Sequence, residues 1–141
     1  MRRGFSLAEV VLVCAFIGIV AGIALPRTAA LLDGVRLRQA AHEVAAAVTL
    51  ARAAAIRRAT YARVVVDSVR GEVRVESGED TLLRRDLRAT HRVEIRATRD
   101  TITYAPSGMG YGVANSTVIM RLGARAETVT VSRLGRMRRS W

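Results

Sequence analysis

Residues 1–25 read MRRGFSLAEVVLVCAFIGIVAGIAL and form a dense apolar block at the start of a 141-residue chain. No charged residue occurs from Val10 to Leu25, and extending this stretch back to Phe5 adds only one, Glu9. About twenty apolar residues are enough for a helix to cross the hydrocarbon core of a bilayer. Because two arginines precede the block, the sequence predicts a membrane-spanning segment with the rest of the chain on the outer side.

Glu9 separates three interpretations of this block. A secretory signal peptide would use Gly22-Ile23-Ala24 as its small-residue cleavage site, and a simple membrane anchor would need only the length. Neither explains an ionised carboxylate in an apolar segment, which costs about 2.5–3.5 kcal/mol and needs a partner. No basic residue follows Glu9 within two helical turns. In the third interpretation, a second protein molecule supplies the cationic partner of Glu9.

That interpretation rests on a resemblance carried by residues 1–9, MRRGFSLAE. Their basic leader, Gly-Phe junction and Ser-Leu-x-Glu motif resemble the signal of type IV pilins and type II secretion pseudopilins. The resemblance implies that a prepilin peptidase cleaves after Gly4 and methylates the new N-terminus at Phe5. It also implies that Glu9 pairs with the N-terminal amine of a neighbouring subunit. Residues 1–4 are then a leader, and the chain is a peptidase substrate and no enzyme.

The apolar pattern keeps a helical period beyond Pro26. Apolar residues recur at steps of three and four and form one stripe on a helix: Leu37, Ala41, Val44, Val48, Ala51 and Ala55. We therefore expect one long helix, with residues 5–25 as its transmembrane and filament-core half and residues 26–60 as its amphipathic half. The stripe favours packing against the chain's own sheet, with a coiled-coil partner as the alternative.

From Tyr61 onward the apolar period changes to two, which predicts short strands. A hairpin is expected first, followed by further strands, at residues 61–67, 72–77, 82–87, 91–97, 101–104, 118–122 and 128–132. The apolar positions expected to face the core are Val64, Val66, Val73, Val75, Val93, Ile95, Ile102, Ile119, Val129 and Val131. The predicted fold class is α+β and pilin-like: a long N-terminal helix, transmembrane in its first half, packed on an antiparallel β domain over residues 61–141.

The C-terminal half narrows the resemblance to the GspH/FimT branch. Residues 103–108 (TYAPSG), 117–122 (TVIMRL) and 129–138 (VTVSRLGRMR) resemble its aromatic-x-Pro-x-Gly turn, paired strands and Gly-Arg-x-Arg signature. Major pilins usually close this region with a disulfide, whereas the only cysteine here is Cys14.

The GspH/FimT resemblance implies a minor subunit of a type II secretion or type IV pilus system, at or near the filament tip. Its partners would be other pilins, the assembly platform and secreted cargo. The subunit would be anchored in the bacterial inner membrane, with residues 26–141 as one periplasmic domain.

The C-terminal arginines suggest a second function. Arg133, Arg136, Arg138 and Arg139 surround Gly135, and residues two apart in an extended segment project to the same side. Guanidinium groups suit phosphate oxygens, and in the FimT side of the family this element is linked to DNA capture in natural transformation. The competing interpretation is that these arginines close the fold by bonding carbonyls or carboxylates. All 23 basic residues are arginine, so their number alone indicates little.

Catalytic and metal-binding motifs are not found in the sequence. His42 and His91 belong to no metal-spaced set, and we expect each to be solvated or hydrogen-bonded. The glycines of residues 108–112 (GMGYG) lack the Lys-Ser/Thr of a phosphate loop and are expected to serve turns. Neither a cofactor nor a metal is expected.

Overall fold

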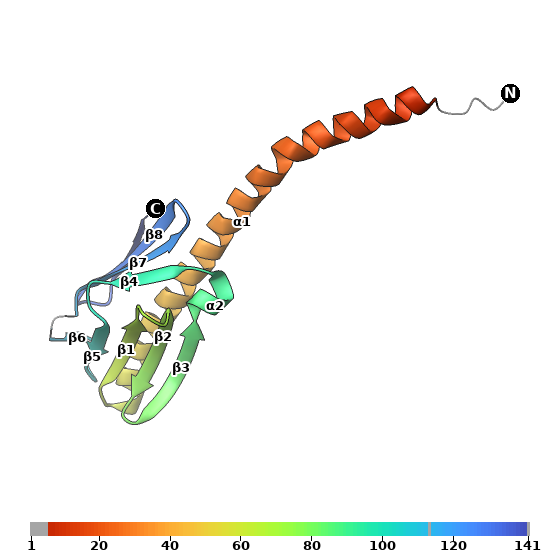
Figure 1. Ribbon diagram of the computed structural model, residues 1–141. Helices are drawn as coiled ribbons and strands as arrows, with labels where there is room; N and C mark the ends of the chain where they lie inside the picture. Colours follow the sequence, from red (N-terminus) through yellow and green to blue (C-terminus); the bar gives the residue numbers. More distant parts are fainter. Residues whose placement is uncertain (1–5, 113, 141) are drawn as a thin grey trace. The chain divides into compact units, whose positions relative to one another are not determined.

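A computed structural model describes residues 6–112 and 114–140, without the side chains of residues 23–29. The chain divides into two compact units, Met1–Gly34 and Val35–Trp141. Helix α1, Leu7–Arg58, runs through both units and is one continuous element of 52 residues (Figure 1). The helical periods of the apolar block and of the stripe that follows it therefore belong to a single helix, as the sequence predicts.

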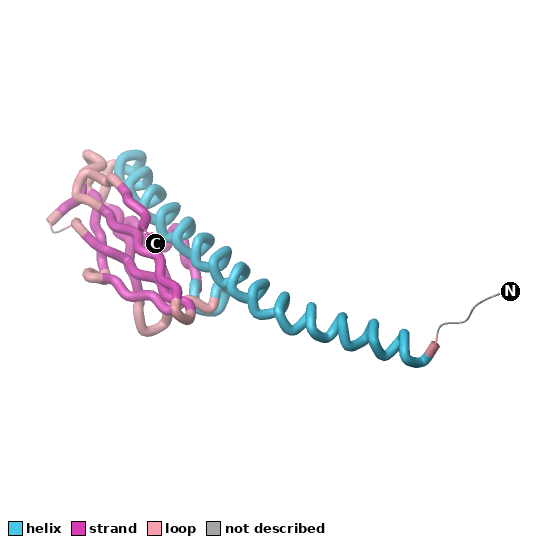
Figure 2. The backbone as a smooth tube through the Cα atoms, turned by 90° about the horizontal axis from the view of Figure 1, so that it is seen from above, coloured by secondary structure: helices cyan, strands magenta, loops and turns pink. Residues whose placement is uncertain are grey.

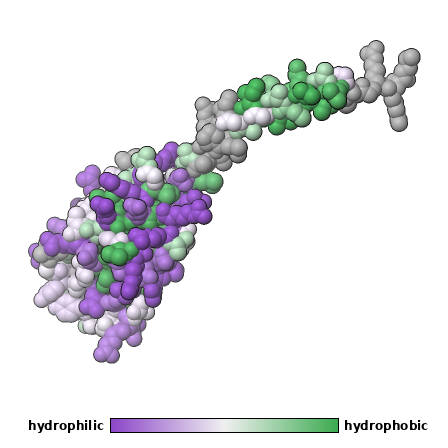
Figure 3. Space-filling view, viewed as in Figure 1, coloured by the Kyte–Doolittle hydropathy of each residue, from purple (hydrophilic) through white to green (hydrophobic). Residues whose placement is uncertain are grey.

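The first unit exposes its apolar side chains. Leu7 is 84% exposed and Phe16 is 68% exposed, and Figure 3 shows a mostly hydrophobic surface along this part of α1. Across the part of the chain that the structure describes, no helix combines the length and apolarity needed to cross a membrane. The predicted transmembrane segment at residues 5–25 is therefore not supported there; its two ends, Phe5 and the side chains of residues 23–25, lie outside the described residues.

The second unit contains two antiparallel sheets. Sheet A has the strand order β3-β2-β1-β5-β6, and sheet B has the order β4-β7-β8-β9. The strands of sheet A are β1 Ala62–Asp67, β2 Glu72–Ser77, β3 Asp80–Asp86, β5 Thr101–Tyr104 and β6 Gly110–Tyr111. Those of sheet B are β4 Glu94–Ala97, β7 Ser116–Leu122, β8 Arg125–Val131 and β9 Met137–Ser140. A short helix, α2 Leu87–His91, connects β3 to β4.

The core lies between one face of α1 and the inner faces of both sheets, and Figure 2 shows α1 running along the strands of this unit. All six residues of the predicted stripe are at most 3% exposed, which confirms that the stripe packs within the chain. Three further alanines of α1, Ala40, Ala47 and Ala54, are buried beside the stripe. Small side chains let the helix backbone approach the sheets closely, so the long helix serves as the second layer of the fold.

The structure differs from the sequence prediction at three points. The strand expected over residues 91–97 begins only at Glu94, because Leu87–His91 forms α2, capped by Asp86 and ended by Arg92 at φ 59°. Strands β6 and β9 were not expected at all. In β7 the buried residues are Val118 and Met120, and Ile119 faces outward, so the predicted inward position of Ile119 is wrong by one residue.

Candidate functional sites

The N-terminal site is described only in part. Gly4 and Phe5, the residues of the predicted cleavage and methylation, lie outside the described residues. Glu9 lies in the first turn of α1, where its backbone N–H donates to Ser6 Oγ at 3.2 Å. The helix dipole favours a carboxylate at this end of a helix, and this effect alone would account for an acidic residue here without any role in assembly. Its side chain is exposed and makes no ion pair or hydrogen bond with another described residue, so it is accessible to a second molecule.

The C-terminal site is built on the turn between β8 and β9. Gly135 has φ +75°, a conformation that favours glycine. The Gly135 N–H donates to the Ser132 carbonyl at 2.8 Å, and the Ser132 N–H donates to the Arg136 carbonyl at 2.9 Å. The Arg136 N–H in turn donates to Ser132 Oγ at 3.1 Å. These bonds fix the backbone of the Gly-Arg-x-Arg element and pair the following strand, β9, with β8.

Arg139 points into the fold. Its Nε and Nη2 donate to Glu127 Oε1 at 3.2 and 2.9 Å, and its Nη1 donates to His42 Nε2 at 3.2 Å. The Glu127 side chain is only 4% exposed, so its carboxylate needs this cation. Arg139 thereby ties β9 to β8 and to α1. For this residue the interpretation that the arginines close the fold is confirmed.

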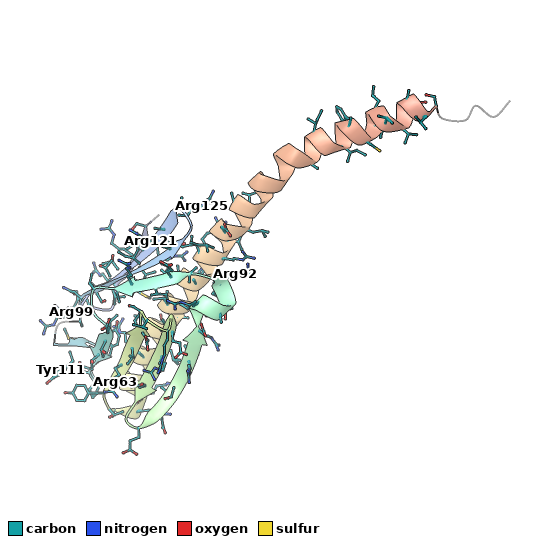
Figure 4. The ribbon with its side chains drawn as sticks, viewed as in Figure 1. Arg63, Arg92, Arg99, Tyr111, Arg121 and Arg125 are labelled. Carbon is teal, nitrogen blue, oxygen red and sulfur yellow. The ribbon has the colours of Figure 1, made fainter. Side chains whose placement is uncertain are left out.

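Arg136 and Arg138 are exposed. Arg138 lies opposite Thr130 in the register of β8 and β9, on the outer face of sheet B, because the neighbouring Val129 is buried. Arg96 and Arg121 lie on the same face, next to the inward-facing Ile95 and Met120; Figure 4 labels Arg121 on β7. This outer face therefore carries several arginines, and Glu94, opposite Arg121, is an acidic neighbour within it.

Arg133 has a mixed role. Its backbone N–H donates to Asn115 Oδ1 at 2.6 Å, and its carbonyl accepts a bond from the Gly110 N–H at 2.8 Å. A Cβ at Gly110 would lie 2.9 Å from that carbonyl oxygen, so only glycine fits there. The Arg133 side chain itself is exposed. The backbone of Arg133 thus links the β8–β9 turn to sheet A, while its side chain is accessible.

The two glycines of the C-terminal motifs both pack on Arg52 of α1. A Cβ at Gly135 would lie 3.0 Å from Arg52 Nη1, and a Cβ at Gly108 would lie 3.4 Å from Arg52 Nε and 2.7 Å from Ile56 Cδ1. The aromatic-x-Pro-x-Gly turn and the Gly-Arg-x-Arg turn, distant in sequence, therefore meet the same residue of the helix. This contact explains why a residue without a side chain occupies both positions.

The two histidines are hydrogen-bonded, as expected. His91 is buried and its Nε2 lies 2.9 Å from Glu43 Oε1, which joins α2 to α1. His42 accepts the bond from Arg139 described above. Across the described residues, no group of three or more His, Cys, Asp or Glu side chains could hold a metal ion.

Sequence reasoning did not identify Glu127, Arg52 or Asn115. A signal was present for Glu127, because it alternates in phase with Val129 and Val131 and must therefore face the core. A carboxylate at an inward position requires a cationic partner, and the arginines of the next strand supply it. No pattern marks Arg52 or Asn115, whose roles depend on which turns the tertiary fold brings to them.

This geometry defines a class of protein: a pilin-like subunit with a long N-terminal helix packed on antiparallel sheets. The family model of the Type II transport protein GspH matches residues 40–135, more than half of the chain. The chain therefore belongs to the GspH family and is a minor pseudopilin of the GspH/FimT type. No curated protein matches the chain in sequence.

Solved structures of minor pilins have the same fold. The type IV minor pilin FimU of Pseudomonas aeruginosa matches in one crystal form with a TM-score of 0.60 and 15% identity, over 74% of this chain and 92% of FimU. In a second crystal form the TM-score is 0.63, with 16% identity, over 77% and 90%. The minor pseudopilin EpsH from the Type 2 Secretion System of Vibrio cholerae matches with a TM-score of 0.58 and 11% identity, over 74% and 96%.

Proposed function

We propose that this minor pseudopilin is built into a filament at or near its tip and takes part in protein secretion. The observation that carries the proposal is the exposed apolar surface of α1 before Gly34, with Glu9 as an acidic residue in its first turn. An apolar helix surface of this kind needs an apolar environment. The cores of filaments made by other pilins would supply it, and the bacterial inner membrane would supply it before assembly.

Processing at the N-terminus would complete the site. Cleavage between Gly4 and Phe5 by the prepilin peptidase would create an amine on Phe5, which the same enzyme would methylate. That cation is the partner we propose for the Glu9 carboxylate of an adjacent subunit. The pairing would form only on assembly, on the platform in the inner membrane, with residues 26–141 on the periplasmic side and accessible to cargo.

The test is the intact mass and N-terminal analysis of the full chain isolated from its native membrane. A species that begins at N-methylated Phe5 supports the proposal. A species that begins at Met1, or after the apolar block, contradicts it. Glu9→Gln, which removes the charge, should then abolish incorporation into sheared filaments while the protein still fractionates with membranes. Glu9→Asp, which keeps the charge, should retain part of the incorporation.

A second candidate function is DNA capture, favoured by the exposed Arg136 and by the exposed Arg138 on the outer face of sheet B. Two of the excess positive charges belong to the leader, so a processed chain keeps nine of the eleven. A polyanion gains affinity by releasing counterions when arginines neutralise its phosphates. Because Arg139 is engaged with Glu127, the DNA contacts would fall to Arg136 and Arg138, with Arg133 beside them.

Removing these two charges tests the DNA proposal. In the full chain, Arg136→Ala with Arg138→Ala should weaken binding equally for all DNA sequences and reduce the salt dependence of affinity by about two phosphate contacts. The matched control is Arg57→Ala with Arg99→Ala, which removes the same charge from exposed positions elsewhere. An equal loss in both double variants would show that net charge alone attracts DNA.

A further inference from the structure

The outer face of sheet A carries a row of polar side chains that the pseudopilin role does not use. Strand register places Tyr111, Thr103, Arg63 and Glu76 opposite one another on β6, β5, β1 and β2, with Thr81 of β3 at the far end. The neighbouring residues Ala62, Val64 and Val75 are buried, so this row faces away from the core. Figure 4 labels Arg63 and Tyr111 at the same end of the sheet.

Two tyrosines form an exposed aromatic corner at one end of this row. The Tyr61 and Tyr111 rings lie 5.0 Å apart at an interplanar angle of 68°, and they are 50% and 60% exposed. Aromatic residues make up only 4% of the chain, and the third tyrosine, Tyr104, is buried. Edge-to-face contact leaves a ring face open toward solvent, where an apolar surface of a ligand can stack.

A hollow of about 230 Å³ lies beside this corner. Seven residues line it, including Tyr61, Arg63, Glu76 and Thr103, so it combines an aromatic wall with hydroxyl, guanidinium and carboxylate groups. An aromatic wall with a few convergent polar groups is typical of small-molecule sites. Its size and lining point to a compact ligand with one apolar face and many hydroxyls.

The charged groups of this hollow are paired. Arg63 Nε donates to Glu76 Oε2 at 2.7 Å, and Arg74 Nε lies 4.0 Å from Glu76 Oε1. A surface of paired charges does not attract a polyanion, in contrast to the arginine-bearing outer face of sheet B. The guanidinium still has N–H donors to offer and the carboxylate still has lone pairs. Adjacent hydroxyls on a ligand can both donate and accept, which fits this pair.

We propose that Tyr61, Tyr111, Arg63, Glu76 and Thr103 form a binding site for a neutral saccharide. A sugar ring stacks its C–H face on the tyrosine corner, and its hydroxyls bond to the Arg63–Glu76 pair and to the Thr103 hydroxyl. The continuation of the row to Thr81 provides further hydroxyl contacts along the sheet for the next units of a glycan chain.

The test is a titration of the full chain in a detergent without a sugar headgroup, followed by amide NMR shifts. The probes are chitohexaose for N-acetylated wall glycans, and cellohexaose and maltohexaose for plain glucans. Saturable shifts at Tyr61, Arg63 and Tyr111 with at least one probe support the site, and the preferred probe identifies the source. The absence of such shifts with all three overturns it.

Variants separate the stacking contribution from the fold. Tyr61→Ala with Tyr111→Ala should weaken binding by at least about tenfold, equivalent to about 1.4 kcal/mol. Tyr61→Phe with Tyr111→Phe keeps both rings and should retain most of the affinity. Val69→Ala, at an 83% exposed residue of the β1–β2 turn, is the control outside the row. Shifts at the same residues with polygalacturonate or an unfolded casein peptide, but not with the neutral probes, would assign the site to another ligand class and overturn the proposal.

Discussion

Arg139 on β9 donates from Nε and Nη2 to one carboxylate oxygen of Glu127 on β8, at 3.2 and 2.9 Å. Their pairing divides the C-terminal arginines into two groups with different tasks. Arg139 serves the fold, because the carboxylate it neutralises is buried. Arg136 and Arg138 are exposed, and Arg138 adds to the positive charge that Arg96 and Arg121 give the outer face of sheet B. Removing Arg139 should therefore lower the stability of the domain, whereas removing Arg136 or Arg138 should change mainly its surface charge.

Arg139→Ala should destabilise the domain by about 2–3 kcal/mol, because it leaves the buried Glu127 carboxylate without its cation. Arg138→Ala, one position earlier and exposed, should change the free energy of unfolding by about 0.5 kcal/mol or less. Urea unfolding of the full chain in mild detergent measures both. In an E127Q background the cost of Arg139→Ala should shrink, since a neutral amide needs no cation. Equal costs in the two backgrounds would contradict the assigned pair.

Gly135→Ala tests the contact between the Gly-Arg-x-Arg turn and the helix. An alanine at φ +75° costs about 1–2 kcal/mol for the backbone alone, and its Cβ would also meet Arg52 Nη1 at 3.0 Å. Gly123→Ala is the matched control, because Gly123 has φ +59° and open space around a Cβ. Thermal unfolding should show a larger loss for Gly135→Ala. In an Arg52→Ala background, Gly135→Ala and Gly123→Ala should lower the stability by similar amounts. A larger loss for Gly135→Ala in that background would mean that Arg52 does not cause the extra cost.

The sequence predicts those parts of the fold that depend on local periodicity. The stripe from Leu37 to Ala55 and the first hairpin follow directly from apolar spacing, and the structure confirms both. The phase of β7 could not be predicted, because Val118, Ile119 and Met120 are three consecutive apolar residues and either alternation is acceptable. Pairing with β8 decides it, since Met120 lies opposite the buried Glu127.

Elements that depend on tertiary partners were beyond sequence reasoning. Strand β9 consists of Met137–Ser140, a stretch with little β propensity, and it forms because β8 offers it an unpaired edge and Glu127 binds Arg139. Helix α2 has only five residues and depends on its cap, in which Asp86 Oδ1 accepts the Ala89 N–H at 2.8 Å. Isolated helices of this length are unstable, so no periodicity reveals them.

Asp67 should make the β1–β2 turn sensitive to acid. Its Oδ1 accepts the N–H groups of Arg70 at 2.8 Å and Val69 at 3.0 Å. The hydrogen bond from Arg70, the larger contribution, together with the bond from Val69 and nearby arginine charges, holds the pKa of Asp67 below its ordinary value. A lowered pKa stabilises the fold above the unfolded-state value, and this stabilisation is lost as the pH falls through the folded-state value.

Asp67→Ala should therefore destabilise the fold near neutral pH, and its difference in free energy of unfolding from the natural chain should narrow as the pH falls from about 5 through the ordinary carboxyl value of 3.8 and below it. Urea midpoints across this range provide the measurement. Asp67→Asn keeps an oxygen acceptor but has no charge. Its stability should therefore show the same pH dependence as that of Asp67→Ala, and it should be higher than that of Asp67→Ala at each pH. A constant difference between Asp67→Ala and the natural chain across this range would contradict the role of the ionised carboxylate.

Tyr104 should make the domain sensitive to alkali. Its side chain is fully buried on β5, and its hydroxyl has no hydrogen-bond partner among the described residues. Burial raises the pKa of Tyr104 above its ordinary value of 10.0, and the positive charge of Arg52 offsets part of this increase. A raised pKa in the folded state means that stability is fully present below the unfolded-state value. It is lost as the pH rises through the folded-state pKa, because ionisation then requires unfolding.

Near neutral pH, Tyr104→Phe should leave the free energy of unfolding unchanged or raise it by up to about 1 kcal/mol, because it removes an unpaired buried hydroxyl. Its urea midpoint should therefore equal or exceed that of the natural chain. Above pH 10.0 the natural chain should lose stability relative to this variant. The chain contains no lysine, so few other groups titrate in this range. Tyr111→Phe, at an exposed ring, serves as the control and should lose stability together with the natural chain. If Tyr104→Phe loses stability in parallel with both, the alkaline transition does not come from the buried hydroxyl.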